Sequence, residues 1–171
     1  MKPKNKNFVK IAHISDLHFG RFWGAIPDRI GACQRSLAKF NPDVVLVTGD
    51  VALFGNRREF LRARDFLDSL PYEKVVVPGN HDVLDGIFLP KINPFRKLRM
   101  FNRYLPYKRD INIGNIEIIG MDSTTSYTIG RGHINLDEFK RFSKNKNTIK
   151  CIALHHHMIA IPDTGEFNML K

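Results

Sequence analysis

The chain has 171 residues, enough for one domain with a sizeable core, and its 43% hydrophobic and 26% charged residues are typical of a globular protein. This composition excludes collagen-like and low-complexity chains, and no apolar run is long enough to span a membrane. The formal net charge of +10 favours anionic partners such as nucleotides or nucleic acid, but it does not bear on the fold.

The N-terminus is basic, but charged residues interrupt the apolar run after it, so it does not have the pattern of a signal peptide. Cys33 and Cys151 do not have the spacing of a metal-binding pair, which favours reduced, partly buried thiols. We therefore expect a single cytoplasmic domain over residues 1–171.

Strand and helix patterns alternate in the first half of the chain. The patterns predict strands at 8–14, 44–47 and 75–77, and helices at 27–40 and 56–70. The second helix begins with Asn56 and Glu59, the spacing of a capping box. A strand-helix-strand-helix-strand order predicts right-handed crossovers and a parallel sheet.

The pattern changes after residue 90. Residues 90–110 predict an amphipathic helix with Phe95, Leu98, Phe101 and Leu105 on one face and basic residues around them. The basic side is either a solvated helix face or a surface for nucleic acid or phosphate.

A Gly114-Asn115 pair between apolar runs predicts a hairpin of type II′ over 111–119, and hence a second sheet. A short helix is predicted from Asn135 with Leu136, Phe139 and Phe142 on its apolar side, and a last strand at 149–154.

Side chains of the kind that bind metals follow four of the predicted strands. They are Asp16 and His18, Asp50, Asn80 and His81, and His155. Oxygen and imidazole donors suit Mn, Fe or Zn. Asp16 and His18 are two residues apart, so in extended backbone they point to the same side. A carboxylate such as Asp50 is suited to bridging two cations held roughly 3.5–4 Å apart.

These motifs, in this order, resemble the calcineurin-like metallophosphoesterase family. The matching segments are Asp16-Leu17-His18, Gly49-Asp50, Gly79-Asn80-His81-Asp82 and Leu154-His155-His156-His157. The resemblance extends from Ile11 to about Pro162 and is nearest to the cyclic-nucleotide phosphodiesterase-like branch. It implies two packed mixed β-sheets flanked by helices, a four-layer α/β/β/α sandwich. It also implies hydrolysis of phosphodiester bonds, cyclic nucleotides among them, or of phosphomonoester bonds by a hydroxide that two divalent metal ions activate.

The resemblance also assigns roles to single residues. Asp16 and His18 hold the first metal, Asp50 bridges, Asn80 and His155 hold the second metal, and His81 acts at the phosphate. We expect His156 and His157 to form the wall of the site, and Asp82 to orient its neighbours without binding metal.

One family motif has no counterpart in this sequence. The family's site is completed by a later Gly-His-x-His, whereas Gly132-His133-Ile134-Asn135 precedes His155 and ends in Asn. From this we expect a C-terminally incomplete domain that binds metal weakly, has little activity and self-associates through an exposed sheet edge.

Two other functions share these residues. One is a non-catalytic binding scaffold of the same fold, which would not need the metal-type donors to be intact. The other is a nuclease of the DNA-repair type, which the basic segment 91–109 favours.

Overall fold

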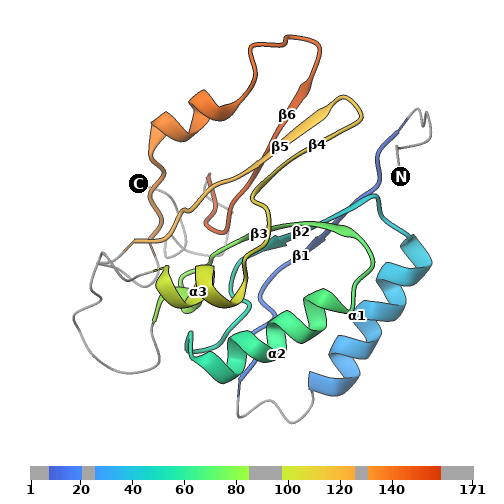
Figure 1. Ribbon diagram of the computed structural model, residues 1–171, viewed down its shortest axis with the longest axis vertical. Helices are drawn as coiled ribbons and strands as arrows, with labels where there is room; N and C mark the ends of the chain where they lie inside the picture. The colour runs from blue at the N-terminus through green and yellow to red at the C-terminus, as the bar shows by residue number, and fades with distance from the viewer. Residues whose placement is uncertain (1–7, 21–25, 85–97, 126–130, 159–171) are drawn as a thin grey trace, which may run out of the picture.

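The computed structural model describes residues 8–20, 26–84, 98–125 and 131–158, and it places them in two three-stranded sheets with helices packed alongside (Figure 1). The elements in chain order are β1 (Ile11–Ile14), α1 (Ile26–Phe40), β2 (Val44–Thr48), α2 (Arg57–Asp68), β3 (Glu73–Val77), η1 (His81–Val83), α3 (Arg99–Tyr104), β4 (Asp110–Ile113), β5 (Ile116–Gly120), η2 (Leu136–Arg141) and β6 (Ile149–Ala153).

The first sheet has the order β1-β2-β3 and is parallel throughout, as the strand-helix alternation predicts. Every residue of the central strand β2 is buried, because the sheet is covered on both faces. Such a strand shows a continuous apolar run in place of an alternating one. The three predicted strands and two predicted helices of this half are confirmed, with boundaries shifted by a few residues.

Helices α1 and α2 cover one face of this sheet (Figure 1). Leu37 of α1 and Phe60 and Leu67 of α2 pack in one apolar cluster with the β-branched residues of β2 and β3. The predicted capping box is present: Asn56 Oδ1 accepts from the Glu59 N–H at 3.1 Å, and Glu59 accepts from the Asn56 N–H at 3.4 Å. This cap fixes where α2 begins.

The second sheet has the order β4-β5-β6, with β4 and β5 antiparallel and β5 and β6 parallel. Gly114 has φ 59°, the positive value that a type II′ turn needs at its first central position, so the predicted hairpin is confirmed. Only this sheet is mixed, whereas the resemblance implied two mixed sheets.

The two sheets pack face to face. Val44, Leu46 and Val75 of the first sheet form an apolar layer with Ile118 and Ala153 of the second. At Gly120 the sheets approach so closely that a Cβ would lie 2.6 Å from Val77 Cγ1. The predicted packing of sheet on sheet is therefore confirmed, and β6 lies at an edge among the described strands.

Two predicted helices differ from expectation. Residues 85–97 lie outside the described residues, and in the remainder of 90–110 only the six residues of α3 are helical, with Phe101 and Leu105 buried. The short helix after Asn135 is the 3₁₀ helix η2, which has no buried residue: Leu136 is 76% exposed and Phe139 is 37% exposed. The short helix is therefore present, and its apolar side is largely exposed. None of the helices in the described ranges has the length and apolarity to cross a bilayer.

Candidate metal centre

The loop after β1 runs beside the loop after β2 and brings their side chains together. The backbone N–H groups of Asp16 and His18 donate to the carbonyls of Gly49 (3.2 Å) and Asp50 (2.9 Å). Asp16 (φ 56°) and His18 (φ 45°) both have left-handed backbone. The prediction of extended backbone at these residues was wrong, and their side chains converge because the chain turns. Such conformations cost about 1–3 kcal/mol each and are concentrated at functional sites.

Asp50 lies where the loops after β2 and β3 touch. It has φ 52°, follows Gly49 with φ 87°, and is 3% exposed. A Cβ at Gly79 would lie 2.1 Å from Asp50 Oδ1, and a Cβ at Gly49 would lie 2.5 Å from the Gly79 nitrogen. Only glycine at both positions allows the loops to approach this closely and leaves the Asp50 carboxylate in place.

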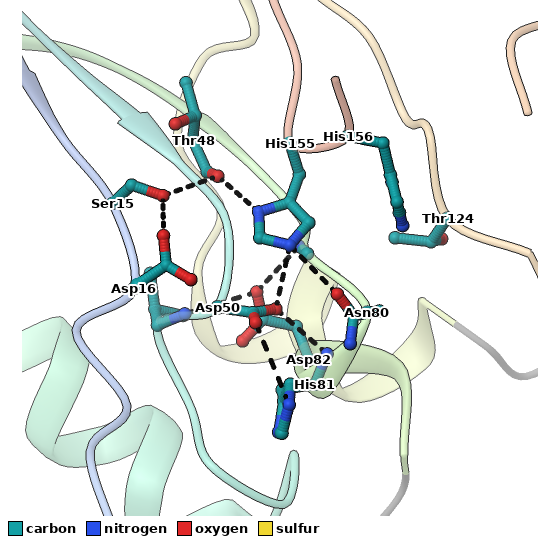
Figure 2. A network of polar contacts seen from close by, with 12 residues as sticks. Ser15, Asp16, Thr48, Asp50, Asn80, His81, Asp82, Thr124, His155 and His156 are labelled. Atoms are coloured by element: carbon teal, nitrogen blue, oxygen red, sulfur yellow. Dashed lines mark hydrogen bonds and ion pairs between the residues drawn. The ribbon is translucent and has the colours of Figure 1, made fainter. Parts of the chain in front are cut away.

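The two oxygens of Asp50 face different side chains (Figure 2). Oδ1 lies 3.6 Å from His155 Nε2 and accepts from the His81 backbone N–H at 2.9 Å. Oδ2 lies 3.7 Å from His18 Nε2 and 4.0 Å from His81 Nε2.

Asp50 therefore belongs to two donor groups at once. One group is Asp16, Asp50 and His155, and the other is His18, Asp50 and His81; within each, the donor atoms lie within 4.8 Å of one another. Five of the six residues predicted from sequence thus meet at one place, and the sixth, Asn80, joins them through His155.

The ring orientation of two histidines is fixed by backbone carbonyls. His155 Nδ1 lies 2.8 Å from the Thr48 carbonyl oxygen, and His81 Nδ1 lies 2.7 Å from that of Leu53. A carbonyl only accepts, so Nδ1 donates, and in the neutral imidazole Nε2 is left with its lone pair. Metal-binding histidines commonly have this arrangement.

Several acceptor atoms face one another around His155. Its Nε2 lies 2.9 Å from Asn80 Oδ1 and 3.6 Å from Asp50 Oδ1, so one nitrogen and two oxygens converge. Acceptors placed this closely repel one another unless a cation or a proton lies between them. The donor set of carboxylate, amide and imidazole fits a divalent cation of the Mn, Fe or Zn kind.

Asp16 and His18 form the outer part of the site. The neighbouring His18, together with a hydrogen bond from Ser15 Oγ, lowers the pKa of Asp16 to about 2. The Asp16 carboxylate in turn raises the pKa of His18. Because Ser15 occupies Asp16 Oδ2, the other oxygen, Oδ1, is turned toward His18 Nε2 at 3.7 Å. Ser15 therefore orients Asp16.

Asp82 connects the loop after β2 with the loop after β3. Its buried carboxylate accepts from the N–H groups of Gly79 (2.9 Å), Ala52 (2.8 Å) and Val51 (3.4 Å). Burial raises the pKa of Asp82 to about 7. These contacts agree with the expectation that Asp82 orients its neighbours, because all three are to backbone and hold η1 against the loop after β2.

His156 is buried beside the site, whereas His157 is exposed. His156 Nδ1 lies 2.8 Å from Ser123 Oγ, and the same hydroxyl accepts from the His156 backbone N–H at 3.3 Å. Burial lowers the pKa of His156 to about 4. Sequence reasoning missed Ser123, although it follows the end of β5, a strand-end position like those of the predicted donors.

The donors line a cleft of about 720 Å³. Its walls include His13, Leu46, Thr48, Ile152, His156 and Met158 together with the donor residues. His133, whose motif was judged unrelated to the site, belongs to neither donor group; its backbone N–H donates to the Ser123 carbonyl at 3.0 Å.

Comparison with known proteins agrees with this geometry. The sequence profile of the calcineurin-like phosphoesterases matches residues 9–168. A glycerophosphodiester phosphodiesterase, GpdQ, of Enterobacter lignolyticus is 36% identical over a region that covers 42% of this chain and 29% of the relative. A probable cyclic nucleotide phosphodiesterase of Coxiella burnetii is 26% identical over 91% of this chain and 62% of the relative. The chain thus spans less than two thirds of the length of either relative.

Proposed function

Because this chain belongs to the calcineurin-like phosphoesterase family, we propose that its strand-end cluster binds two divalent cations and hydrolyses phosphodiester bonds. The observation that carries the proposal is the position of the Asp50 carboxylate. One oxygen faces His155 and the other faces His18 and His81, so a single buried group belongs to both donor groups. A shared carboxylate is what holds two cations close together in two-metal hydrolytic sites.

The residues that would hold the cations are Asp16, His18, Asp50, Asn80 and His155. When bound, two such cations neutralise phosphate charge and lower the pKa of water so that hydroxide forms near neutral pH. The chain supplies the positions: Thr48 fixes the His155 ring, Ser15 fixes the Asp16 carboxylate, and Asp82 fixes the loop that carries Asn80.

His81 is the residue proposed to act on the phosphate. Its backbone N–H holds Asp50 Oδ1, and the Leu53 carbonyl fixes its Nδ1, so Nε2 is directed toward the site. In the imidazolium form, Nε2 donates a hydrogen bond to a phosphate oxygen and then a proton to the departing oxygen. The same nitrogen is also near enough to His18 and Asp50 to serve as a metal ligand, which the second experiment below distinguishes.

The names of the relatives support a diester as substrate. Both relatives carry the name of phosphodiesterases, one for glycerophosphodiesters and one for cyclic nucleotides. The net charge of +10 favours an anionic substrate of either kind.

The test of the shared carboxylate is metal content. Asp50→Ala should retain less Mn than a variant of any other single ligand, since both cations lose a donor, and hydrolysis of a chromogenic phosphodiester with added Mn should be lost. Asp28→Ala, which removes an exposed carboxylate from α1, is the matched control and should retain parental metal. Equal metal in Asp50→Ala and the parent would refute the bridging role.

The second experiment separates the two roles of His81. If His81 acts on the phosphate, His81→Ala keeps most of the metal and lowers turnover by roughly 10²–10⁴-fold, the usual scale of acid–base catalysis. A loss of metal as large as that in His18→Ala would instead make His81 a ligand.

A further inference from the structure

Arginine side chains are concentrated on the exposed sides of α2 and α3. The exposed ones are Arg57, Arg58, Arg62, Arg99 and Arg103, here called the arginine surface. The two helices lie side by side (Figure 1) because the ring of Phe60 in α2 packs against Phe101 (6.2 Å between centroids) and Tyr104 (6.4 Å) in α3. The two helices that carry these exposed side chains therefore pack against each other.

None of these arginines forms an ion pair with any residue in the described ranges. Two acids of α2 are engaged elsewhere: Glu59 is buried in the capping box, and Asp68 accepts from the Tyr107 hydroxyl. Asp65 is the remaining exposed acid of the helix, and it forms no ion pair with these arginines. The five guanidinium groups of the arginine surface therefore lack carboxylate partners among the described residues.

The basic residues of the second sheet behave differently. Lys140 pairs with Asp137 at 2.6 Å, Arg141 with Glu138 at 3.0 Å, and Lys150 with Glu117 at 2.5 Å. These three basic residues of the second half thus have carboxylate partners, which the five arginines lack among the described residues. This contrast argues against a face that is basic only for solubility.

The arginine surface adjoins the metal centre. Helix α3 contacts η1, which begins with His81. Leu53, whose carbonyl fixes the His81 ring, lies only a few residues before the start of α2 at Arg57. An anionic chain lying on these helices therefore has a short path to the cleft on the His81 side.

We propose that the arginine surface binds the phosphate backbone of a nucleic acid strand. Guanidinium groups form paired hydrogen bonds with phosphate oxygens, a geometry that lysine lacks. An anionic membrane fits less well, since the large exposed hydrophobic side chains in the described ranges lie outside α2 and α3, and these helices offer none to insert. The proposal concerns binding and does not depend on hydrolysis at the metal centre.

The test is fluorescence anisotropy of a labelled oligonucleotide of about 20 nucleotides, single-stranded and as duplex, from 50 to 200 mM salt. EDTA is present throughout, so binding is measured without metal and independently of the proposed activity. The parent should bind with a steep salt dependence. Arg58→Gln/Arg62→Gln and, separately, Arg99→Gln/Arg103→Gln should weaken binding about tenfold or more and lower the salt slope by about 1–2 units.

Lys144→Gln/Lys146→Gln is the matched control, because it removes the same charge from two exposed lysines of the other half. It should change the affinity less than threefold or so. Equal losses in the control and both arginine variants would show only a response to net charge and would overturn the proposal. So would a parent that fails to bind either oligonucleotide, or one that binds only vesicles containing phosphatidylserine. Thermal melting of each variant checks that the exposed substitutions leave the fold intact.

Discussion

The two sheets of this protein contribute to the site in different ways. The parallel sheet provides Asp16, His18, Asp50 and Asn80, which lie on short loops directly after its buried strands. Among the described residues, the mixed sheet provides only His155, and ion pairs form on its exposed side. The site therefore depends on local loop geometry on one side and on packing between the sheets on the other.

His155 illustrates the second dependence. Its ring is held by the Thr48 carbonyl of the opposite sheet, and its neighbour His156 is held by Ser123. Asp16 and His18, by contrast, take their positions from backbone hydrogen bonds to Gly49 and Asp50 within the first sheet. Substitutions between the sheets should therefore affect metal binding by moving His155, whereas substitutions in the loops of the first sheet should affect it by moving the donors on those loops.

The largest expected effect comes from Gly79→Ala. A Cβ there would lie 2.1 Å from Asp50 Oδ1 and 2.4 Å from the Asp50 nitrogen, so the carboxylate must move and both donor groups lose it. We expect metal retention to fall to background in elemental analysis, with a loss of stability of about 1–3 kcal/mol. Gly31→Ala in α1 is the control, because the added Cβ contacts only the Arg35 side chain. This variant should keep its metal, and its free energy of unfolding should rise by about 0.5–1 kcal/mol.

A second prediction tests the packing between the sheets. Ile118→Ala removes a fully buried side chain from the layer between the sheets, and Leu67→Ala removes one from the helix layer. Each substitution should lower the free energy of unfolding, measured by urea denaturation, by about 2–5 kcal/mol. Only Ile118→Ala should also weaken Mn binding, because it loosens the sheet that carries His155. Equal weakening of Mn binding by both variants would contradict the comparison.

The features on which these predictions depend were not equally predictable from the sequence. The β-branched runs of β2 and β3, the Asn56–Glu59 cap and the Gly114 turn each follow from local chemistry, so the order of elements was predictable. The donors after β1, β2 and β3 were predictable because they follow strands whose ends meet in a parallel sheet, and His155 was predictable because it follows an apolar strand and matches the family's motif.

The left-handed backbone of Asp16 and His18 was not predictable in this way, because it accompanies hydrogen bonds to carbonyls of the loop after β2, which is distant in sequence. The left-handed backbone of Asp50 was also not predictable, because that residue lies against Gly79 of another loop. Ser123 was missed for a related reason: its role depends on His156, which is distant in sequence. The apolar side of η2 is largely exposed, which periodicity could not predict, because it carries no information about what a helix face will contact.

A third, smaller effect is expected from Ser123→Ala. The hydroxyl contacts both the ring and the backbone N–H of His156, whose Nε2 already has no partner in the described structure. Removing the hydroxyl should lower the free energy of unfolding by about 1–3 kcal/mol. It should also weaken Mn binding about tenfold, because His156 is the neighbour of the donor His155. Ser69→Ala, which loses a hydroxyl contact with Phe66 far from the site, is the control and should leave Mn affinity unchanged.

The smallest effect tests strain in the first sheet. His18→Gly relieves left-handed backbone and removes a buried Nδ1 that has no hydrogen-bond partner among the residues described. In EDTA, we expect this variant to unfold at higher urea, by about 1 kcal/mol, although it binds metal less well. Asn41 also has left-handed backbone, at the end of α1. Asn41→Gly should raise the free energy of unfolding by less than His18→Gly does, because asparagine tolerates this conformation. A destabilised His18→Gly would show that the loop is not strained.

The most direct test of the shared Asp50 carboxylate is the electron paramagnetic resonance spectrum of the protein at saturating Mn²⁺. Two ions bridged by one carboxylate are magnetically coupled, so we expect a dinuclear spectrum that Asp50→Ala replaces with that of isolated Mn²⁺. A parental spectrum of isolated Mn²⁺ alone, unchanged by Asp50→Ala, would contradict the account.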